Sequence, residues 1–342
     1  MKSKFIGMTI VVGLFSWSAI EVVEAQDDFL ITRPFANIVE QFDGLTGNYL
    51  GPFVTAGDGG LVRPGAVAVG PDQNVYVTSL LTGQVLRYDG ISGEFIDVFA
   101  EGNGISTPNN LVFNGDYLYV GDFSGGASGF LRRFDAATGA FVDEFADVDF
   151  TDGIEFTSDA VYVSNFNVGV LKFDLQDGSF IENFIPSGHG GLLSPTALLF
   201  LDNGDLLVSS YNTNSVKRYS PNGDYIDDVI TDLFQPEGLA IGLDGNLYAG
   251  SYGLGIVNKY DANTFEFIEE FANLGPVTNF FTFRSELLLG DVNSDGIVSL
   301  LDIAPFVDLI NNGGFQLEAD INKDGVVDLL DVSPLVLLLS RG

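Results

Sequence analysis

Short runs of alternating hydrophobic and polar residues, bounded by Gly, Asp, Asn or Pro, recur from residue 29 to residue 285. Four such runs follow one another in residues 64–99, PGAVAVGPDQNVYVTSLLTGQVLRYDGISGEFIDVF. A period of two between turn residues predicts β-strands joined by tight hairpins. The Asn-Gly and Asp-Gly pairs at 222–223 and 244–245 suit such turns, because positive φ costs these residues little.

The four-run pattern returns at a period of about forty residues. Its third run ends in an aromatic residue, usually followed by Asp. This pair occurs at Phe42-Asp43, Tyr88-Asp89, Phe134-Asp135, Phe173-Asp174, Tyr219-Ser220 and Tyr260-Asp261. Four antiparallel strands at this period form one propeller blade, and blades stack because a single sheet cannot bury both faces. The sequence therefore predicts an all-β, six-bladed β-propeller.

The two ends of the repeat region complete each other. Residues 29–53 match only the last three strands of the next copy, and residues 276–283, PVTNFFTF, match the missing opening strand. Pairing them closes the ring and removes two open sheet edges. Residues 286–290 resemble a further second strand, so a closure that differs by one strand stays open.

These repeats resemble the NHL family of β-propellers over residues 29–285. The resemblance is carried by Pro-x-Gly, Asp-Gly-x-x-Tyr and Lys/Arg-Tyr-Asp patterns, as in PEGLAIGLDGNLYAGSYGLGIVNKYD, residues 236–261. It implies the fold but no single function, because such propellers serve as binding scaffolds and as enzymes.

Two copies of one acidic loop lie near the C-terminus, GDVNSDGIVSLLD at 290–302 and ADINKDGVVDLLD at 319–331. Ca²⁺ takes six to eight oxygen ligands, and a twelve-residue loop supplies them from alternating positions around a Gly turn. Asp replaces the usual Glu at the twelfth position. We predict two Ca²⁺ ions, held by Asp291, Asn293, Asp295, Ile297 (carbonyl), Ser299 and Asp302, and by Asp320, Asn322, Asp324, Val326 (carbonyl), Asp328 and Asp331.

No helix-patterned segment precedes either loop, so each is a half-hand followed by one predicted helix. This tandem resembles a dockerin type I domain. The resemblance implies a small α-helical, calcium-binding module that attaches secreted proteins to a cohesin-type partner, often in assemblies linked to polysaccharide breakdown.

Two features depart from the usual dockerin pattern. Leu300-Leu301 and Leu329-Leu330 occupy positions where many dockerins carry polar partner-reading residues, and they are either a partner surface or internal packing. Pro305 and Pro334 follow each final Asp by three residues, which predicts a kinked helix or a later helix start.

Charge and composition narrow the choice of partners. The 47 acidic residues outnumber the 14 basic ones and give a net charge of −33, which disfavours nucleic acid and anionic membranes. Residues 1–25 have the charged start, apolar stretch and small-residue end of a signal peptide, which predicts secretion to the cell exterior or surface. No later segment predicts a membrane span, and there is no cysteine. The predicted domains are therefore 1–25, 26–286 and 287–342.

Propeller ligands usually bind where the blades meet the central channel. The candidate catalytic or binding residues that enter a first strand or leave a second one are Asn109, Asn110, Asp122, Asp152, Asn165 and Glu237. They would suit a lactonase or lyase, but Asp and Asn beside Gly and Pro more often cap turns, and we favour that interpretation. The one histidine, His189, is predicted to lie on an exposed loop.

Three functions stay open at this stage. The favoured one is a non-catalytic propeller that binds a glycan or protein and is attached through the calcium-folded tail. The alternatives are an enzyme that processes polysaccharide or lactone in the propeller channel, and a purely structural envelope component.

Overall fold

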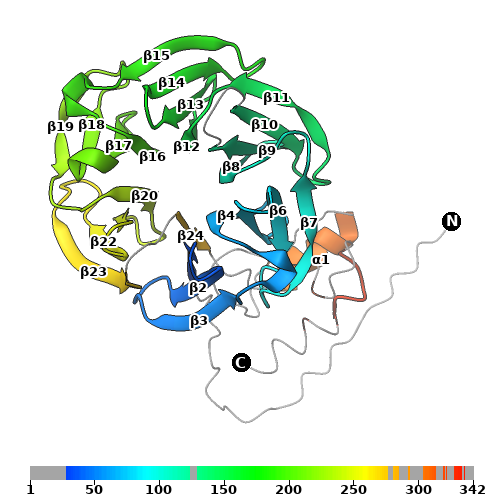
Figure 1. The fold of residues 1–342 in the computed structure, drawn as a ribbon. Coiled ribbons are helices and arrows are strands. Elements are labelled where there is room, and N and C mark those ends of the chain that lie inside the picture. Colours follow the sequence, from blue (N-terminus) through cyan, green and yellow to red (C-terminus); the bar gives the residue numbers. More distant parts are fainter. Residues whose placement is uncertain are drawn as a thin grey trace. The chain divides into compact units, whose positions relative to one another are not determined.

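The computed structural model describes residues 28–123, 129–275, 280–284 and 303–312, together with 292, 319, 321, 327–332 and 335. The chain divides into two compact units, and the larger extends from Gln26 to Glu286. This unit consists of six four-stranded sheets around a central opening (Figure 1). The predicted all-β, six-bladed propeller is confirmed.

Each blade is one antiparallel sheet, named here from its innermost strand outward. Blade 1 contains β24 (Phe281–Arg284), β1 (Asp28–Arg33), β2 (Ile38–Asp43) and β3 (Tyr49–Val54). Blade 2 contains β4 (Pro64–Val69), β5 (Val75–Ser79), β6 (Gln84–Tyr88) and β7 (Phe95–Glu101). Blade 3 contains β8 (Pro108–Asn114), β9 (Tyr117–Asp122), β10 (Phe130–Asp135) and β11 (Phe141–Asp147).

Blades 4 to 6 repeat the same order. Blade 4 contains β12 (Thr151–Phe156), β13 (Ala160–Asn165), β14 (Gly169–Asp174) and β15 (Phe180–Pro186). Blade 5 contains β16 (Pro195–Phe200), β17 (Leu206–Ser210), β18 (Ser215–Tyr219) and β19 (Tyr225–Ile230). Blade 6 contains β20 (Pro236–Ile241), β21 (Leu247–Ser251), β22 (Ile256–Tyr260) and β23 (Phe267–Asn273). Three single 3₁₀ turns are η1 (Asp58–Gly60), η2 (His189–Gly191) and η3 (Tyr211–Thr213).

The ring closes as the repeat pattern predicts. Strand β24 pairs antiparallel with β1, with Phe283 opposite Phe29. A buried ion pair between Arg284 and Asp28 joins the same two strands. The possible further strand at 286–290 lies outside the described residues.

A tyrosine in the second strand connects neighbouring blades. The Tyr76 ring lies 4.8 Å from Phe99 of its own blade and 4.8 Å from Phe113 of the next blade. Tyr119, Tyr162 and Tyr248 make the same pair of contacts in blades 3, 4 and 6. Edge-to-face aromatic pairs of this kind add about 1 kcal/mol beyond area burial. The repeated aromatic positions therefore form the core between blades.

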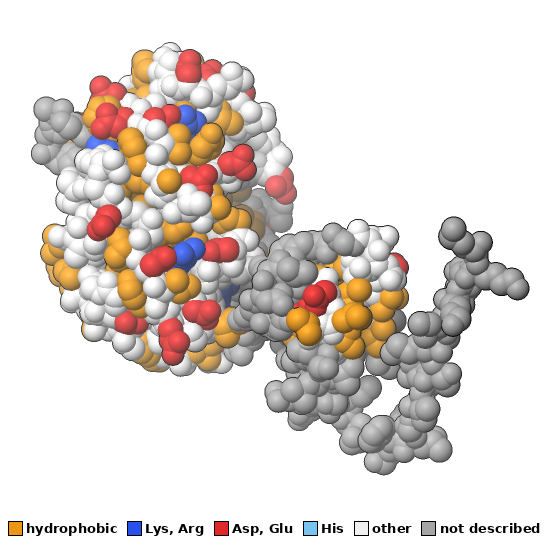
Figure 2. All heavy atoms as spheres, turned by 90° about the vertical axis from the view of Figure 1, so that its right-hand side faces the viewer, with side chains coloured by type: hydrophobic (Ala, Val, Ile, Leu, Met, Phe, Trp, Pro, Cys, Tyr) orange, Lys and Arg blue, Asp and Glu red, His pale blue; other side chains and the backbone are white. Residues whose placement is uncertain are grey.

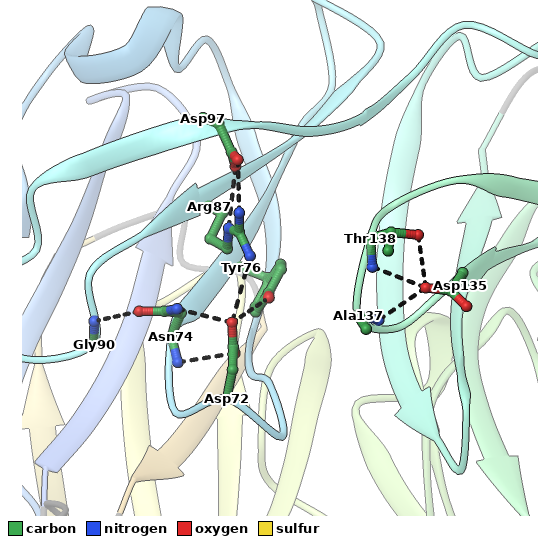
Figure 3. Close-up of polar contacts among 9 residues, drawn as sticks. All are labelled: Asp72, Asn74, Tyr76, Arg87, Gly90, Asp97, Asp135, Ala137 and Thr138. Carbon is green, nitrogen blue, oxygen red and sulfur yellow. Dashed lines mark hydrogen bonds and ion pairs between the residues drawn. The ribbon is translucent and has the colours of Figure 1, made fainter. Parts of the chain in front are cut away.

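The repeated Asp residues make turns, as Figure 3 shows for Asp135. One Asp135 oxygen accepts bonds from the Ala137 and Thr138 amides and from the Thr138 hydroxyl, at 3.2, 2.8 and 2.7 Å. Gly139 follows with φ +70°, and a Cβ there would come within 1.9 Å of the Phe99 carbonyl oxygen of the neighbouring blade. The turn therefore needs Gly both for its backbone angle and for close blade packing.

A second polar motif, Asp-x-Asn-x-Tyr, ties the hairpin between the first two strands to the outer strands (Figure 3). Asp72 accepts bonds from the Asn74 side chain and the Tyr76 hydroxyl at 2.8 and 2.9 Å. Arg87 lies 3.5 Å from Asp72 and also bonds both carboxylate oxygens of Asp97. These acidic residues have partners within their own blade, so their presence needs no ligand.

The viewed face of the propeller carries scattered acidic side chains among hydrophobic ones (Figure 2). Part of the hydrophobic surface comes from the outermost strands, where an aromatic and an aliphatic residue are exposed at the start of each. The exposed pairs are Tyr49-Leu50, Phe95-Ile96, Phe141-Val142, Phe180-Ile181, Tyr225-Ile226 and Phe267-Ile268. Among the described residues, no helix is long and apolar enough to cross a bilayer.

The C-terminal module contains α1 (Ile303–Asn312) and a small core of its own. Phe306 and Leu335 are buried together, and they lie at matching places in the two halves, 29 residues apart. The described helix begins at Ile303, so Pro305 occupies the first turn of α1, which agrees with the predicted later start rather than with a kink. An amide there has no partner within the helix, so proline removes no bond. Pro334 lies outside the described residues.

Candidate functional site

The second acidic loop is described only at its end. Asp331 is fully buried, and one of its carboxylate oxygens accepts a bond of 3.0 Å from the Asp328 amide. Asp328 in turn accepts a 2.7 Å bond from the Leu330 amide. Carboxylate oxygens held in a tight, partly buried turn fit the oxygen chemistry that Ca²⁺ requires.

The remaining predicted calcium ligands lie outside the described residues. They are Asp291, Asn293, Asp295, Ile297, Ser299, Asp302, Asp320, Asn322, Asp324 and Val326. Leu300 and Leu301 also lie outside them, whereas Leu329 and Leu330 are 74% and 65% exposed. Exposure of this second pair favours a partner surface over internal packing.

A cavity of about 280 Å³ lies at the end of the propeller channel where the innermost strands begin, and we call it the channel mouth. Its lining comes mainly from two repeated positions, the second residue of an innermost strand and the residue after a second strand; Arg63, which precedes β4, is the exception. The lining residues are Pro34, Arg63, Leu80, Asn109, Phe123, Asp152, Phe166, Thr196, Tyr211, Glu237 and Tyr252.

β-Bulges deliver the first of these positions to the mouth. In β12 the pairing with β13 runs from Thr151↔Asn165 directly to Ile154↔Val163, so Asp152 lies in a bulge. The pairing of β20 with β21 skips Glu237 in the same way. A bulge leaves a residue out of the ladder and redirects its side chain. The bulges therefore aim Asp152 and Glu237 into the cavity rather than at a neighbouring strand.

A repeated backbone bond fixes the second position. The amides of Phe123, Phe166, Tyr211 and Tyr252 each donate to the carbonyl of the residue just before the innermost strand of the same blade, at 2.9, 3.3, 3.1 and 3.0 Å. The four rings form a continuous arc, with centroids of successive neighbours 6.2, 5.8 and 6.1 Å apart. Each ring is half-buried. The mouth thus has an aromatic wall contributed by four consecutive blades.

The two carboxyl groups of the mouth are buried, with Asp152 3% and Glu237 8% exposed. The Asn109 side chain donates a 2.8 Å bond to Asp152, whereas Glu237 Oε2 has no hydrogen-bond partner among the described residues. Burial raises the pKa of Asp152 to about 7, although the bond from Asn109 opposes this. Burial and the nearby charge of Asp152 raise the pKa of Glu237 well above its usual range. The pair therefore tends to hold a proton near neutral pH.

The other sequence candidates have different roles. Asn110 donates its side-chain amide to the Asp152 carbonyl and so supports the bulge. Asp122 accepts bonds from the Ser106 and Thr107 amides at 2.8 and 3.0 Å and lies 3.5 Å from Arg132. It does not line the mouth.

Asn165 caps its own turn by accepting bonds from the amides of Asn167 and Val168 at 2.9 and 3.0 Å. The turn-cap interpretation therefore describes Asn165 and, with its loop partners, Asp122. It does not describe Asp152 and Glu237, which make no such bond among the described residues.

His189 is exposed in η2, as predicted, and its Nε2 accepts a 3.3 Å bond from the Tyr225 amide. It does not line the mouth. Within the described part of the chain, no group of three or more His, Cys, Asp or Glu side chains is placed to hold a metal ion.

Sequence reasoning missed the aromatic wall. Its members recur at spacings of 43, 45 and 41 residues, close to the repeat period, as positions 123, 166, 211 and 252 show. Aligning the residue that follows each second strand would have found them.

Residues 289–337 match the family model of the dockerin type I domain. This match decides the nature of the tail. The chain carries a dockerin type I domain behind a six-bladed β-propeller. Dockerin type I domains bind calcium, and their presence implies a cohesin-binding assembly module of the kind typical of extracellular cellulosomes.

Solved structures share the propeller fold. A crystal structure of a nidogen/laminin complex contains a chain that is 13% identical, with a TM-score of 0.62, covering 75% of this dockerin-bearing chain and 98% of the other. A gluconolactonase from Xanthomonas campestris is 16% identical, with a TM-score of 0.51, covering 67% and 85%. At these identities the likeness concerns the fold alone. No curated protein matches the sequence.

Proposed function

We propose that this chain is an exported component of an extracellular assembly, in which the propeller binds a glycan or protein ligand and the dockerin domain holds the propeller in place. In this proposal residues 1–25 are the signal peptide, residues 26–286 bind the ligand, and residues 287–342 bind a cohesin-type partner. The dockerin match at 289–337 behind a complete propeller carries the proposal. A link to polysaccharide breakdown is part of it.

The attachment depends on two Ca²⁺ ions in this account, one in each acidic loop, which would supply the electrostatic attraction that closes the loops. Asp331 and Asp328 would hold the second ion together with the predicted ligands before them. The shared core around Phe306 and Leu335 would then bring both halves into one module. Metal ligation stabilises modules of about fifty residues that have small cores.

The full-length chain tests the attachment when cohesin modules are titrated against it in calcium and in EDTA. We expect binding in calcium only, and a loss of more than about tenfold in the Asp302→Ala/Asp331→Ala variant, because each loop loses its last ligand. Asp308→Ala is the control, since Asp308 is exposed on α1 and is not a predicted ligand. Undiminished binding in EDTA would contradict the calcium-dependent attachment.

The exposed leucines provide a second, independent test of the same surface. Leu329→Asp/Leu330→Asp should weaken cohesin binding while calcium uptake stays unchanged, because both side chains are exposed and neither is a predicted ligand. Equal loss of calcium uptake would instead assign the leucines to internal packing.

The propeller's own ligand would bind at the channel mouth. The aromatic wall offers apolar faces for stacking, and the buried carboxyl and amide groups offer hydrogen-bonding groups for orientation. A concave, partly apolar site with a few convergent polar groups is the usual form of a small-ligand site. Strain supports this placement, because Arg63, Phe150, Ser194 and Gln235, which precede innermost strands, all have left-handed φ between 49° and 56°.

A second candidate function is catalysis at the same mouth. The observation that favours it is the raised pKa of both Asp152 and Glu237, since a carboxyl pair that holds one proton near pH 7 can serve as acid and base. A lactone or a polysaccharide would be the substrate class. If assays of sugar or lactone turnover detect an activity, Asp152→Asn and Glu237→Gln should each abolish it. Retained activity in both variants would remove these residues from catalysis.

A further inference from the structure

Most buried acidic side chains of the propeller have a basic partner. Asp28 is paired with Arg284, Glu40 lies 2.9 Å from Arg33, and Asp122 lies 3.5 Å from Arg132. A buried charge without a partner lowers the stability of the fold by roughly several kcal/mol compared with a paired one. The fold therefore supplies basic partners for acids where they serve structure.

The channel mouth breaks this rule. Asp152 and Glu237 share one small cavity, and no ion pair joins either of them to a basic residue among the described residues. Glu237 Oε2 is buried, points into the cavity lining and lacks a hydrogen-bond donor. The mouth thus contains two carboxyl groups that no basic residue pairs with in the part of the chain that the structure describes.

Arg63 is the basic residue that lines the mouth, and it does not fill this role. Its side chain is exposed, and its guanidinium lies over the Phe35 ring at 5.3 Å from the centroid. Its charge opposes the rise in the pKa of Tyr252, but it forms no ion pair with Asp152 or Glu237.

The aromatic wall adds a second feature that suits a cation. The faces of aromatic rings are electron-rich, and they attract ammonium groups within about 6 Å of the ring centroid. Tyr211 lies near both carboxyl groups, and their charges, after burial, raise its pKa to about 12. Burial and the nearby charge of Glu237 likewise raise the pKa of Tyr252. The rings and the carboxyl groups therefore face one site.

We propose that the channel mouth binds a protonated amine, with its ammonium group at Asp152 and Glu237 and its carbon skeleton against the rings of Phe166, Tyr211 and Tyr252. This inference rests on the proposed function, because it names the chemical class of ligand for the same mouth. The cavity of about 280 Å³ is smaller than the roughly 300–1,000 Å³ of drug-sized sites. It suits a single amino-sugar unit or a short alkylamine.

Ammonium binding has a consequence that a neutral sugar would not have. The carboxyl pair retains a proton near neutral pH, and an arriving cation favours its release. The charged and titratable groups around Glu237 are Asp152, Tyr211, Tyr252 and Arg63. Burial raises the pKa of both carboxyl groups, that of Asp152 to about 7, so a cation that binds them should release a proton and bind more tightly as the pH rises through 7.

The test is isothermal titration calorimetry on the full-length chain with matched probes: glucosamine against glucose, and n-butylamine against n-butanol. We expect each amine to bind at least tenfold more tightly than its neutral analogue at about pH 6.5, where both amines are protonated. n-Butylamine, whose amino group stays protonated beyond pH 8 as that of Lys does, should also release a proton on binding, seen as a dependence of the heat on the buffer. The preferred amine distinguishes an amino-sugar source from an aliphatic one.

Variants assign the effect to the mouth. Glu237→Gln should abolish the preference for the amine, whereas Glu155→Gln should keep it, because Glu155 lines the channel beyond the mouth. Thermal melts check that both variants fold. Glucose bound as tightly as glucosamine would overturn the ammonium inference and leave a glycan site intact. Failure of all four probes would overturn it too, while cohesin binding would still test the attachment separately. A preference for the amine that survives Glu237→Gln would also contradict it.

Discussion

Asp122 and Glu237 are both buried acids close to the mouth end of the channel, but their surroundings differ. Asp122 receives bonds from two backbone amides and lies beside the guanidinium of Arg132, itself 2% exposed. Glu237 faces a cavity, and one of its oxygens has no partner among the described residues. The difference teaches that burial of an acid does not by itself identify a binding site. A buried acid whose oxygen has no partner among the described residues is the better indicator.

The largest expected effect is at the paired acid. Asp122→Ala should lower the free energy of unfolding by about 3 kcal/mol, because it removes the buried carboxylate beside Arg132 and leaves only the exposed Glu144 as its acidic neighbour. Urea unfolding of the purified chain measures this. Glu144→Ala is the matched control, since Glu144 is exposed and lies 3.6 Å from the same guanidinium, and it should cost less than about 1 kcal/mol. Equal losses would remove the distinction between the two kinds of acid.

The opposite sign is expected at the mouth. Glu237→Gln should raise the free energy of unfolding by about 2 kcal/mol at pH 8, because it removes a charge that is buried next to Asp152. Residues kept for binding often cost stability in this way. The measurement is again urea unfolding, and a destabilised Glu237→Gln protein would show that the carboxylate has a structural partner.

The gain should depend on pH in a defined direction. A raised pKa means that the folded state binds the proton more tightly than the unfolded state does, so the destabilisation appears as the pH rises from the usual Glu value of about 4.5 through the raised pKa of Glu237. At pH 4 the variant and the parent should therefore differ little.

Below that pH the stability of the propeller should depend on Asp244 instead. Burial would raise the pKa of Asp244, but bonds from Lys259 and Asn246 outweigh burial and lower this pKa to about 2. The contribution of Asp244 to stability is therefore lost as the pH falls from about 4 to 2.

The smallest effect is expected at Asn109. Asn109→Ala removes the 2.8 Å bond to Asp152 and should cost about 1 kcal/mol at pH 8. It should cost less at pH 4, where Asp152 is protonated. A loss as large as that of Asp122→Ala would mean that the mouth is a structural network rather than a binding site.

The fold was largely predictable from the sequence because each blade repeats the same local rules. Aromatic residues such as Tyr76 and Phe99 recur at core positions, and the Asp135 turn requires the following Gly139. The closing strand was predictable because the first copy of the repeat lacked one strand and residues 276–283 matched it.

The site was less predictable because partners, unlike strands, are not periodic. Asp122 ends the second strand of blade 3 and Asp152 lies near the start of the innermost strand of blade 4, and only the folded chain reveals that one has Arg132 beside it and the other has Asn109 from a neighbouring blade. At Pro305 the sequence left a kink and a later helix start open for a different reason. Proline breaks a helix only beyond the first turn, and that position depends on where the helix begins.

The central claim is that Glu237 Oε2, which has no partner among the residues that the structure describes, gains one when a ligand arrives. Carbon-13 NMR of the Glu237 carboxyl group, followed through a pH titration of the full-length chain, tests it most directly. The account predicts a midpoint well above the usual value for Glu in the free protein, and a lower midpoint once glucosamine or n-butylamine is added. A midpoint near 4.5 in the free protein, unchanged by either amine, would contradict it.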